Sequence, residues 1–159
     1  MPSDSQRWPL FLVAPLALTL PAAHATVYLT VEQAQQTLFP GARLMPLERA
    51  GRERVWRADS EGWFIVDQVL GKHELITYAL ALGRDGRVRG LEILEYRESH
   101  GGKVREGGWR AQFLGKNADD PLQLERDIAN ISGATLSCRH VTEGVKRLLG
   151  LHERELRQR

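Results

Sequence analysis

Two neighbouring apolar runs decide the fold: Glu74-Leu-Ile-Thr-Tyr-Ala-Leu-Ala-Leu82 and Val88-Arg-Gly-Leu-Glu-Ile-Leu-Glu-Tyr-Arg97. Both are rich in the aliphatic, β-branched and aromatic residues that strands favour. The segment between them, Gly83-Arg-Asp-Gly-Arg87, contains an Asp-Gly pair, which is typical of a tight hairpin turn. Strands joined by so short a segment must be antiparallel. The sequence therefore predicts an antiparallel sheet built around this hairpin.

The second strand of the hairpin carries apolar residues on both of its faces. Side chains alternate between the two faces of a strand, so Leu91 and Ile93 should share one face and point into the core. By the same alternation, Val88, Leu94 and Tyr96 should lie on the other face. We therefore expect both faces of this strand to be at least partly covered.

Three further strands are expected upstream of the hairpin. Trp63–Leu70 and Val55–Ala58 have strand-like composition and are bounded by turn residues. Ala42–Arg49 is interrupted by Pro46, which cannot donate a hydrogen bond to a neighbouring strand. This run is therefore predicted to lie at an edge of the sheet.

Helices are expected at both ends of the domain. Thr30-Val-Glu-Gln33 has the spacing of a capping box, and Pro40-Gly41 should end the helix that follows it. Near the C-terminus, the run Val141–Leu149 has apolar residues at helical spacing. The fold class is therefore α+β, with an antiparallel sheet of about five or six strands packed by an N-terminal and a C-terminal helix.

The N-terminus has the pattern of a secretory signal peptide, predicted to cover residues 1–25. Arg7 precedes an apolar run, Trp8–Leu20, and an Ala-x-Ala cleavage pattern ends at Ala25. An uncleaved membrane anchor is the alternative, but the run is shorter than the ~20 apolar residues that span a bilayer and contains prolines. We expect a mature domain of residues 26–159 outside the cytoplasm, most simply in a bacterial periplasm.

Composition narrows the classes of function. The chain has 159 residues, which suggests one domain after the leader. The formal net charge is +2, from 22 Lys and Arg against 20 Asp and Glu. This balance gives no support to nucleic-acid binding, which needs a strongly basic surface.

Candidate catalytic residues are few. Cys138 is the only cysteine, so neither an internal disulfide nor a cysteine-based metal site can form. Its place near a helix start would favour a thiolate, but His140, two residues on, should lie on another helix face. Asp119 and Asp120 stand in a polar segment with nothing to shift their pKa values. These residues do not predict an independent enzyme.

The stretch Ser132-Gly-Ala-Thr135 leads directly into the C-terminal helix. The first backbone N–H groups of a helix lack internal partners and lie at the positive end of its dipole, so they can bind a phosphate. The alternative is an ordinary helix cap, in which Thr135 or Ser137 satisfies those N–H groups. Residue spacing alone leaves both interpretations open.

The run Ser132–Ser137 resembles the flavinylation motif of the FMN-binding domain, found in NqrC and RnfG subunits of electron-transport complexes and in small secreted relatives. In that family, an ApbE-type flavin transferase, dependent on FAD and magnesium, attaches FMN through a phosphoester to the last Thr of the motif. The resemblance implies covalent FMN on Thr135. It also implies that cofactor contacts come from Ser132, Gly133, Ala134, Leu136 and Ser137.

One position departs from the family pattern. Members usually have Asp three residues before the first Ser or Thr of the motif, where this sequence has Ala129. Asp127 and Asn130 are the nearby polar residues that could replace the missing carboxylate.

A second resemblance lies after the hairpin. Glu98-Ser-His100-Gly101 and the stretch from Trp109 to Lys116 are similar to family elements in which a Gly-rich loop lies against the flavin ring. The resemblance implies cofactor contacts from Glu98, His100, Gly101 and Gly102. Trp109 is a further candidate, although an aromatic residue paired with Phe113 at helical spacing is ordinarily part of the core.

These resemblances, which fall between residues 74 and 149, imply an electron carrier rather than an independent enzyme. It would relay electrons between membrane or periplasmic redox partners through FMN on Thr135. The alternative is a redox-silent periplasmic interaction module in which the Ser-Gly-Ala-Thr turn only caps a helix. Noncovalent flavin binding is a third possibility.

Overall fold

The structure is a computed structural model that describes residues 26–59, 61–98 and 102–159. The predicted signal peptide and two predicted flavin contacts, His100 and Gly101, lie outside the described residues. Within those residues the chain forms a six-stranded antiparallel sheet in the order β1-β6-β5-β4-β3-β2. The strands are β1 (Thr26–Val27), β2 (Leu44–Leu47), β3 (Arg54–Ala58), β4 (Gly62–Leu70), β5 (Leu75–Gly83) and β6 (Val88–Tyr96).

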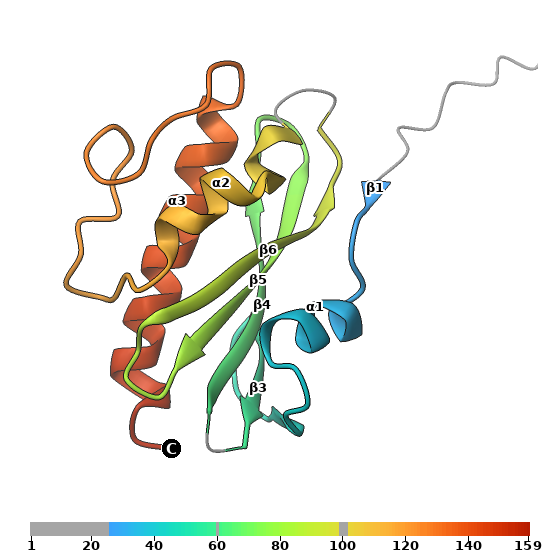
Figure 1. The fold of residues 1–159 in the computed structure, drawn as a ribbon, viewed down its shortest axis with the longest axis vertical. Coiled ribbons are helices and arrows are strands. Elements are labelled where there is room, and N and C mark those ends of the chain that lie inside the picture. The colour runs from blue at the N-terminus through green and yellow to red at the C-terminus, as the bar shows by residue number, and fades with distance from the viewer. Residues whose placement is uncertain (1–25, 60, 99–101) are drawn as a thin grey trace, which may run out of the picture.

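Helices cover both faces of this sheet (Figure 1). One face packs against the N-terminal helix and the other against the long C-terminal helix, so the apolar side chains of both faces are buried. The predicted fold class is therefore confirmed. The helical elements are α1 (Val31–Leu38), the 3-10 turn η1 (Gly102–Arg105), α2 (Gly107–Arg110), the 3-10 turn η2 (Ala111–Phe113), α3 (Thr135–Leu151) and the π turn η3 (His152–Leu156).

The N-terminal helix and the edge strand predicted for the first part of the chain are confirmed. The Thr30 hydroxyl accepts a hydrogen bond from the Gln33 N–H at 3.2 Å, and the Gln33 side chain accepts one from the Thr30 N–H at 2.8 Å. This capping box starts α1. Pro46 lies in β2, which forms the edge of the sheet opposite β1.

The sheet has two cores because both of its faces are covered. Along β4, Phe64 and Val66 pack on the α1 side, whereas Ile65 packs on the α3 side. This alternation explains why β4 and β5 are nearly continuous runs of apolar residues. The β5–β6 hairpin therefore lies inside the sheet, and α3 packs over β4 and β5.

The faces assigned to the β6 residues need a correction. Val88 and Tyr96 lie in the α3-side core with Leu91 and Ile93, and only Leu94 lies on the α1 side. The pairing of β5 with β6 shifts register twice, between Thr77 and Tyr78 and between Ala81 and Leu82. Each extra residue reverses the alternation of faces that follows it. Coverage of both faces is confirmed, but the faces predicted for Val88 and Tyr96 were wrong.

A long connection between η2 and α3 runs beside α3 before the chain enters that helix (Figure 1). The Lys146 ammonium on α3 donates to the Pro121 carbonyl at 2.8 Å and ties the connection to the helix. Leu122 and Glu125 adopt left-handed backbone conformations, with φ of +46° and +63°. The connection therefore follows a defined path that ends at the Ser132–Thr135 turn.

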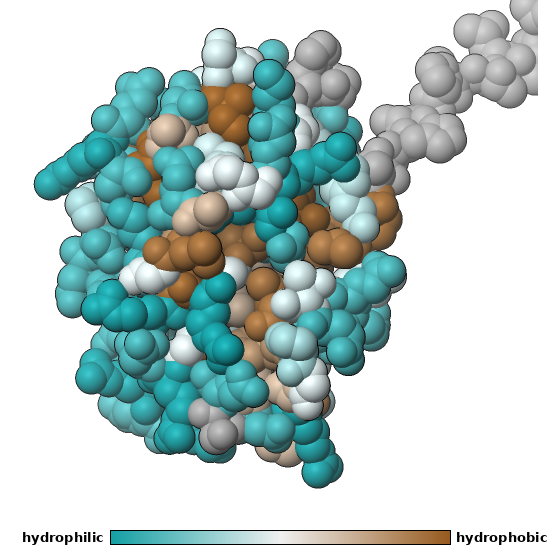
Figure 2. Space-filling view, in the orientation of Figure 1, coloured by the Kyte–Doolittle hydropathy of each residue, from teal (hydrophilic) through white to brown (hydrophobic). Residues whose placement is uncertain are grey.

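The face drawn in Figure 2 is mostly hydrophilic, with its apolar side chains gathered mainly across the middle of the molecule. Across residues 26–59, 61–98 and 102–159, no helix has both the length and the apolar character needed to cross a membrane.

Candidate functional site

The turn before α3 places the Thr135 side chain at the start of the helix. Gly133 has a φ of +83°, a left-handed conformation that glycine adopts without steric cost. Ala134 is the N-cap residue, and its N–H donates to the Ile131 carbonyl at 2.9 Å. An alanine cap has no side-chain oxygen to accept from the first N–H groups of the helix. These N–H groups therefore face the site without a side-chain cap.

The two hydroxyls that could have capped the helix bond elsewhere. The Thr135 Oγ1 accepts a hydrogen bond from the Asn130 side-chain nitrogen at 3.1 Å. The Ser137 hydroxyl is buried and lies 3.0 Å from the Tyr96 hydroxyl. The second polar atom of the Asn130 side chain, Oδ1, is buried and has no hydrogen-bond partner in the described structure. Asn130 therefore holds Thr135 and retains one unused acceptor.

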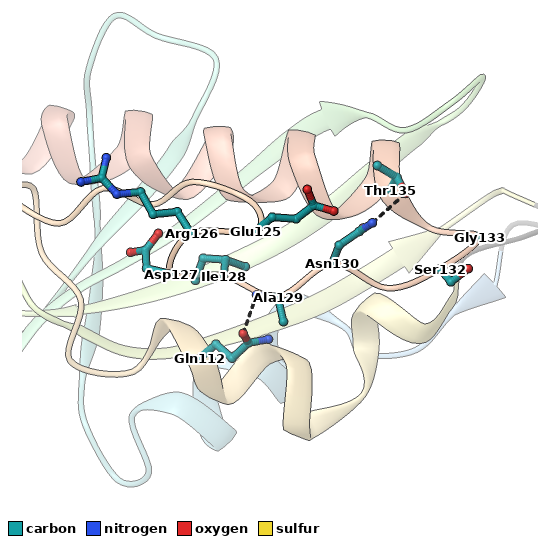
Figure 3. A pocket seen from close by; sticks show the side chains of 10 residues that line it. All are labelled: Gln112, Glu125, Arg126, Asp127, Ile128, Ala129, Asn130, Ser132, Gly133 and Thr135. Carbon is teal, nitrogen blue, oxygen red and sulfur yellow. Dashed lines mark hydrogen bonds between the residues drawn. The ribbon is translucent and has the colours of Figure 1, made fainter.

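Thr135 lines three cavities, which we name by their walls. The loop cavity, about 760 Å³, is formed mainly by residues 125–133 (Figure 3). The helix cavity, about 350 Å³, lies between residues 122–125 and the outer face of α3. The turn cavity, about 520 Å³, lies between the β4–β5 turn and the first turn of α3. Ligand pockets are typically about 300–1,000 Å³, so the loop and turn cavities are large enough for a cofactor.

The turn cavity brings together most of the predicted contacts. Lys72, His73 and Glu98 form one wall, and the opposite wall carries Leu136, which is 38% exposed. The members of the Ser132–Ser137 motif that line this cavity are Gly133, Ala134, Thr135, Leu136 and Ser137.

Glu98 shapes the wall of the turn cavity. Its carboxylate accepts hydrogen bonds from the backbone N–H groups of His73 and Glu74, the latter at 3.0 Å. Burial opposes the charged form of Glu98, but the backbone N–H donors of the turn outweigh it and lower the pKa of this carboxyl. Glu98 therefore lines the turn cavity with its carboxylate hydrogen-bonded to the protein backbone.

Glu98→Gln should weaken the β4–β5 turn in a pH-dependent way. Because the folded-state pKa is lowered, the carboxylate stabilises the fold above its unfolded-state pKa of about 4.3, and this contribution is lost as the pH falls through the folded-state pKa. The variant should melt below the wild type at pH 7 and approach it at pH 3. Thermal unfolding at both pH values measures this, with Glu74→Gln as the control. An equal difference at both pH values would contradict the role of the charge.

Trp109 lies under the site rather than in it. Its ring is buried and packs edge-on against Phe113, with ring centroids 5.1 Å apart. Its indole N–H donates to the Ala129 carbonyl at 2.8 Å, and the Gln112 side chain accepts from the Ala129 N–H at 2.7 Å. Both backbone groups of Ala129 are therefore held, and this clamp fixes the segment that carries Asn130. The observed contacts of Trp109 are those of a core residue, which was the alternative expected for it.

Comparison with known families decides the class of protein. The family model described as the FMN-binding domain matches residues 71–150, which is half of the chain. The chain belongs to the FMN-binding domain family. It is therefore a flavin-binding protein, and FMN is the ligand that the family implies. The matched segment contains β5, β6, all three cavities and all of α3 except its last residue. A search of curated proteins finds no match to the chain.

The residues present are compatible with FMN. A phosphate group at Thr135 would meet the uncapped N–H groups at the start of α3. Arg139, one helical turn after Thr135, lines the helix cavity with it and can balance a phosphate charge. The turn cavity offers apolar surface from Ala134 and Leu136 for a flavin ring.

The structure distinguishes the two polar residues near the Ser132–Thr135 turn, Asp127 and Asn130, by their contacts. Asp127 pairs with the Lys116 ammonium at 2.9 Å and accepts from the Gln123 N–H at 2.8 Å. Burial opposes the charged form of Asp127, but these donors outweigh burial and lower the pKa of its carboxyl. The charged carboxylate is thereby held within the loop. Asn130, in contrast, contacts the Thr135 hydroxyl directly. Of the two candidates, Asn130 is the one beside the motif threonine.

Cys138 has the environment of a structural residue. It is fully buried in the α3-side core, and burial raises the pKa of its thiol. Gly102 starts η1 and does not line any of the three cavities.

Sequence reasoning did not identify several residues that surround Thr135. Gln112, Glu125 and Arg126 line the loop cavity, and Lys72 and His73 line the turn cavity. No motif marks them, because the fold alone brings their loops to α3. Arg139 was accessible to a spacing argument, since a residue four positions after Thr135 lies on the same helix face.

Proposed function

We propose that the protein is an extracytoplasmic electron-transfer flavoprotein that carries FMN attached covalently, through a phosphoester, to Thr135. The observation that carries this proposal is the position of the Thr135 hydroxyl. It lies at an uncapped helix start, is held by Asn130 and lines three cavities. FMN, when attached, supplies the redox chemistry, whereas the protein holds and orients it.

The chain divides the binding task between two groups of residues. The phosphate of the ester would be held by the first N–H groups of α3 and by Arg139. The flavin ring would be held by the residues of the turn cavity, where Leu136 provides apolar surface and Lys72 provides positive charge. Because Leu136 is exposed, this arrangement keeps the cofactor near the surface, where a redox partner can approach it.

Two kinds of partner follow from the proposal. An ApbE-type flavin transferase, using FAD and magnesium, would attach the FMN. A membrane or periplasmic redox protein would then exchange electrons with it. Export would rely on the predicted signal peptide, cleaved after Ala25, and covalent attachment would prevent loss of the cofactor outside the cytoplasm.

Coexpression with a flavin transferase tests the proposal directly. The secreted protein should be yellow, should keep its colour through acid precipitation, and should gain the mass of FMN less one water. Fragmentation should place this mass on the peptide that contains Thr135. Release of the colour into the acid supernatant would instead indicate noncovalent binding. A colourless protein of unmodified mass would contradict the proposal.

A further inference from the structure

Attachment of FMN requires an acceptor for the proton of the Thr135 hydroxyl. The Oγ1 atom accepts a hydrogen bond from Asn130 at 3.1 Å, which occupies one of its lone pairs. The hydroxyl proton has no acceptor among the hydrogen bonds of the described residues. When Oγ1 forms a bond to phosphorus, this proton must leave, and a carboxylate beside it is a suitable base.

Four carboxylates share a cavity with Thr135, and three of them are unsuitable. Glu98 accepts from backbone N–H groups of the β4–β5 turn, and Asp127 is paired with Lys116. Glu143 lies eight residues along α3 from Thr135, which is about 12 Å at 1.5 Å per residue. Among the described residues that line a cavity with Thr135, Glu125 is the carboxylate left to serve this hydroxyl.

Glu125 has the placement that such a role needs. It lines both the loop cavity and the helix cavity, and Thr135 lines the same two. Figure 3 shows its carboxylate pointing toward the first turns of α3, on the side where Asn130 meets Thr135. Its side chain makes no hydrogen bond or ion pair within residues 26–59, 61–98 and 102–159.

The backbone holds Glu125 in this position. The residue has a φ of +63°, and its N–H donates to the Ile128 carbonyl at 2.8 Å. Leu124 and Ile128 form a parallel bridge across the same turn. The side chain therefore projects from a closed turn, rather than from a segment free to choose its direction.

We propose that Glu125 accepts the Thr135 proton during flavin transfer, an inference that rests on the proposed function. The Thr135 Oγ1 attacks the phosphorus atom of the FMN half of FAD, and a new P–O bond forms. The bond between this phosphorus and the oxygen bridging to the adenylate phosphate breaks, and AMP leaves with that oxygen. The proton passes to the Glu125 carboxylate and from there to water, with no change in oxidation state. Asn130 positions the attacking oxygen.

The rate of adduct formation on the full mature chain tests this inference. Purified unmodified protein is mixed with flavin transferase, FAD and magnesium, and the modified fraction is followed by intact mass over time. Glu125→Gln should slow attachment by about 100-fold, the usual scale for losing a general base. Glu125→Asp should retain more of the rate than Glu125→Gln, because it keeps a carboxylate. Glu143→Gln, a change in the same helix cavity, should leave the rate unchanged.

A second variant separates chemistry from folding. Ala129 lines the loop cavity, so Ala129→Asp adds a carboxylate there. In the Glu125→Gln background, this change should recover part of the lost rate, which repair of a folding defect would not explain. Circular dichroism and thermal unfolding should show that each variant is folded.

The possible failures are distinguishable. If the wild type is modified and Glu125→Gln is modified equally fast, the inference about Glu125 is wrong and the proposed function stands. If the wild type gains no mass with a transferase that modifies another substrate, the proposed function fails and the inference falls with it.

Discussion

Thr135→Val should abolish covalent attachment of FMN while leaving the fold intact. Valine has nearly the shape of threonine but no hydroxyl, so no ester can form. The change removes one hydrogen bond, from Asn130, and should cost about 1 kcal/mol of folding free energy. After coexpression with the transferase, the variant should show the unmodified mass and should lose any bound colour on acid precipitation. Thr135→Ser, which keeps a hydroxyl, should still be modified.

Neighbouring hydroxyls make this experiment decisive. Ser137 is buried against Tyr96, so it is not accessible to a transferase. Ser132 is exposed and lines the loop cavity, and it is therefore the competing site. An adduct on Thr135→Val that maps to Ser132 would show that the turn is the target and that Thr135 is the wrong residue of it. Ser132→Ala should still carry its adduct on Thr135.

The features of the fold that depend on a few neighbouring residues were predictable from the sequence. The Asp-Gly turn, the Thr30 capping box and Pro46 each act within a few residues, and each was confirmed. The faces of Val88 and Tyr96 were not predictable, because they depend on two shifts in register against β5. A bulge changes which face a residue occupies without changing composition or periodicity.

Only the part of the candidate site that lies within one continuous segment was predictable from the sequence. The Ser132–Thr135 turn and its helix are contiguous, and their resemblance to a family pointed to Thr135. The groups that surround the hydroxyl come from elsewhere: Glu125 from a closed turn ten residues earlier, and Lys72 from the β4–β5 turn. Loop residues are brought to a site by the whole fold, so a pattern within one segment does not reveal them.

Asp67→Ala should cause a large loss of stability. The side chain of Asp67 on β4 is 1% exposed and forms an ion pair with Arg147 of α3. Its carboxylate also accepts from the Tyr78 hydroxyl at 2.7 Å, and the Arg52 Nε lies 3.4 Å away. The substitution removes the buried acceptor of these contacts and should cost roughly 2–3 kcal/mol. The cost should stay below the roughly 3–5 kcal/mol of a fully buried pair, because Arg147 is 36% exposed and keeps its ion pair with Glu53 at 2.8 Å. Urea unfolding should show a much lower midpoint than the wild type.

Tyr78→Phe is the matched control for this network. Burial, and then the neighbouring carboxylate of Asp67, raise the pKa of Tyr78 well above its ordinary value, so the hydroxyl stays protonated and donates. Its removal leaves Asp67 paired with Arg147, and the cost should be only about 1 kcal/mol.

A double-mutant cycle between Asp67→Ala and Arg147→Ala tests whether the charge pair ties α3 to the sheet. The two side chains contact each other, so the loss in the double variant should be clearly smaller than the sum of the single losses. Additive losses would mean that Asp67 stabilises β4 alone. If the pair couples the two elements, it also fixes the angle at which α3 presents Thr135 to its cavities. Asp67→Ala should then slow flavin attachment even under conditions where the variant remains folded.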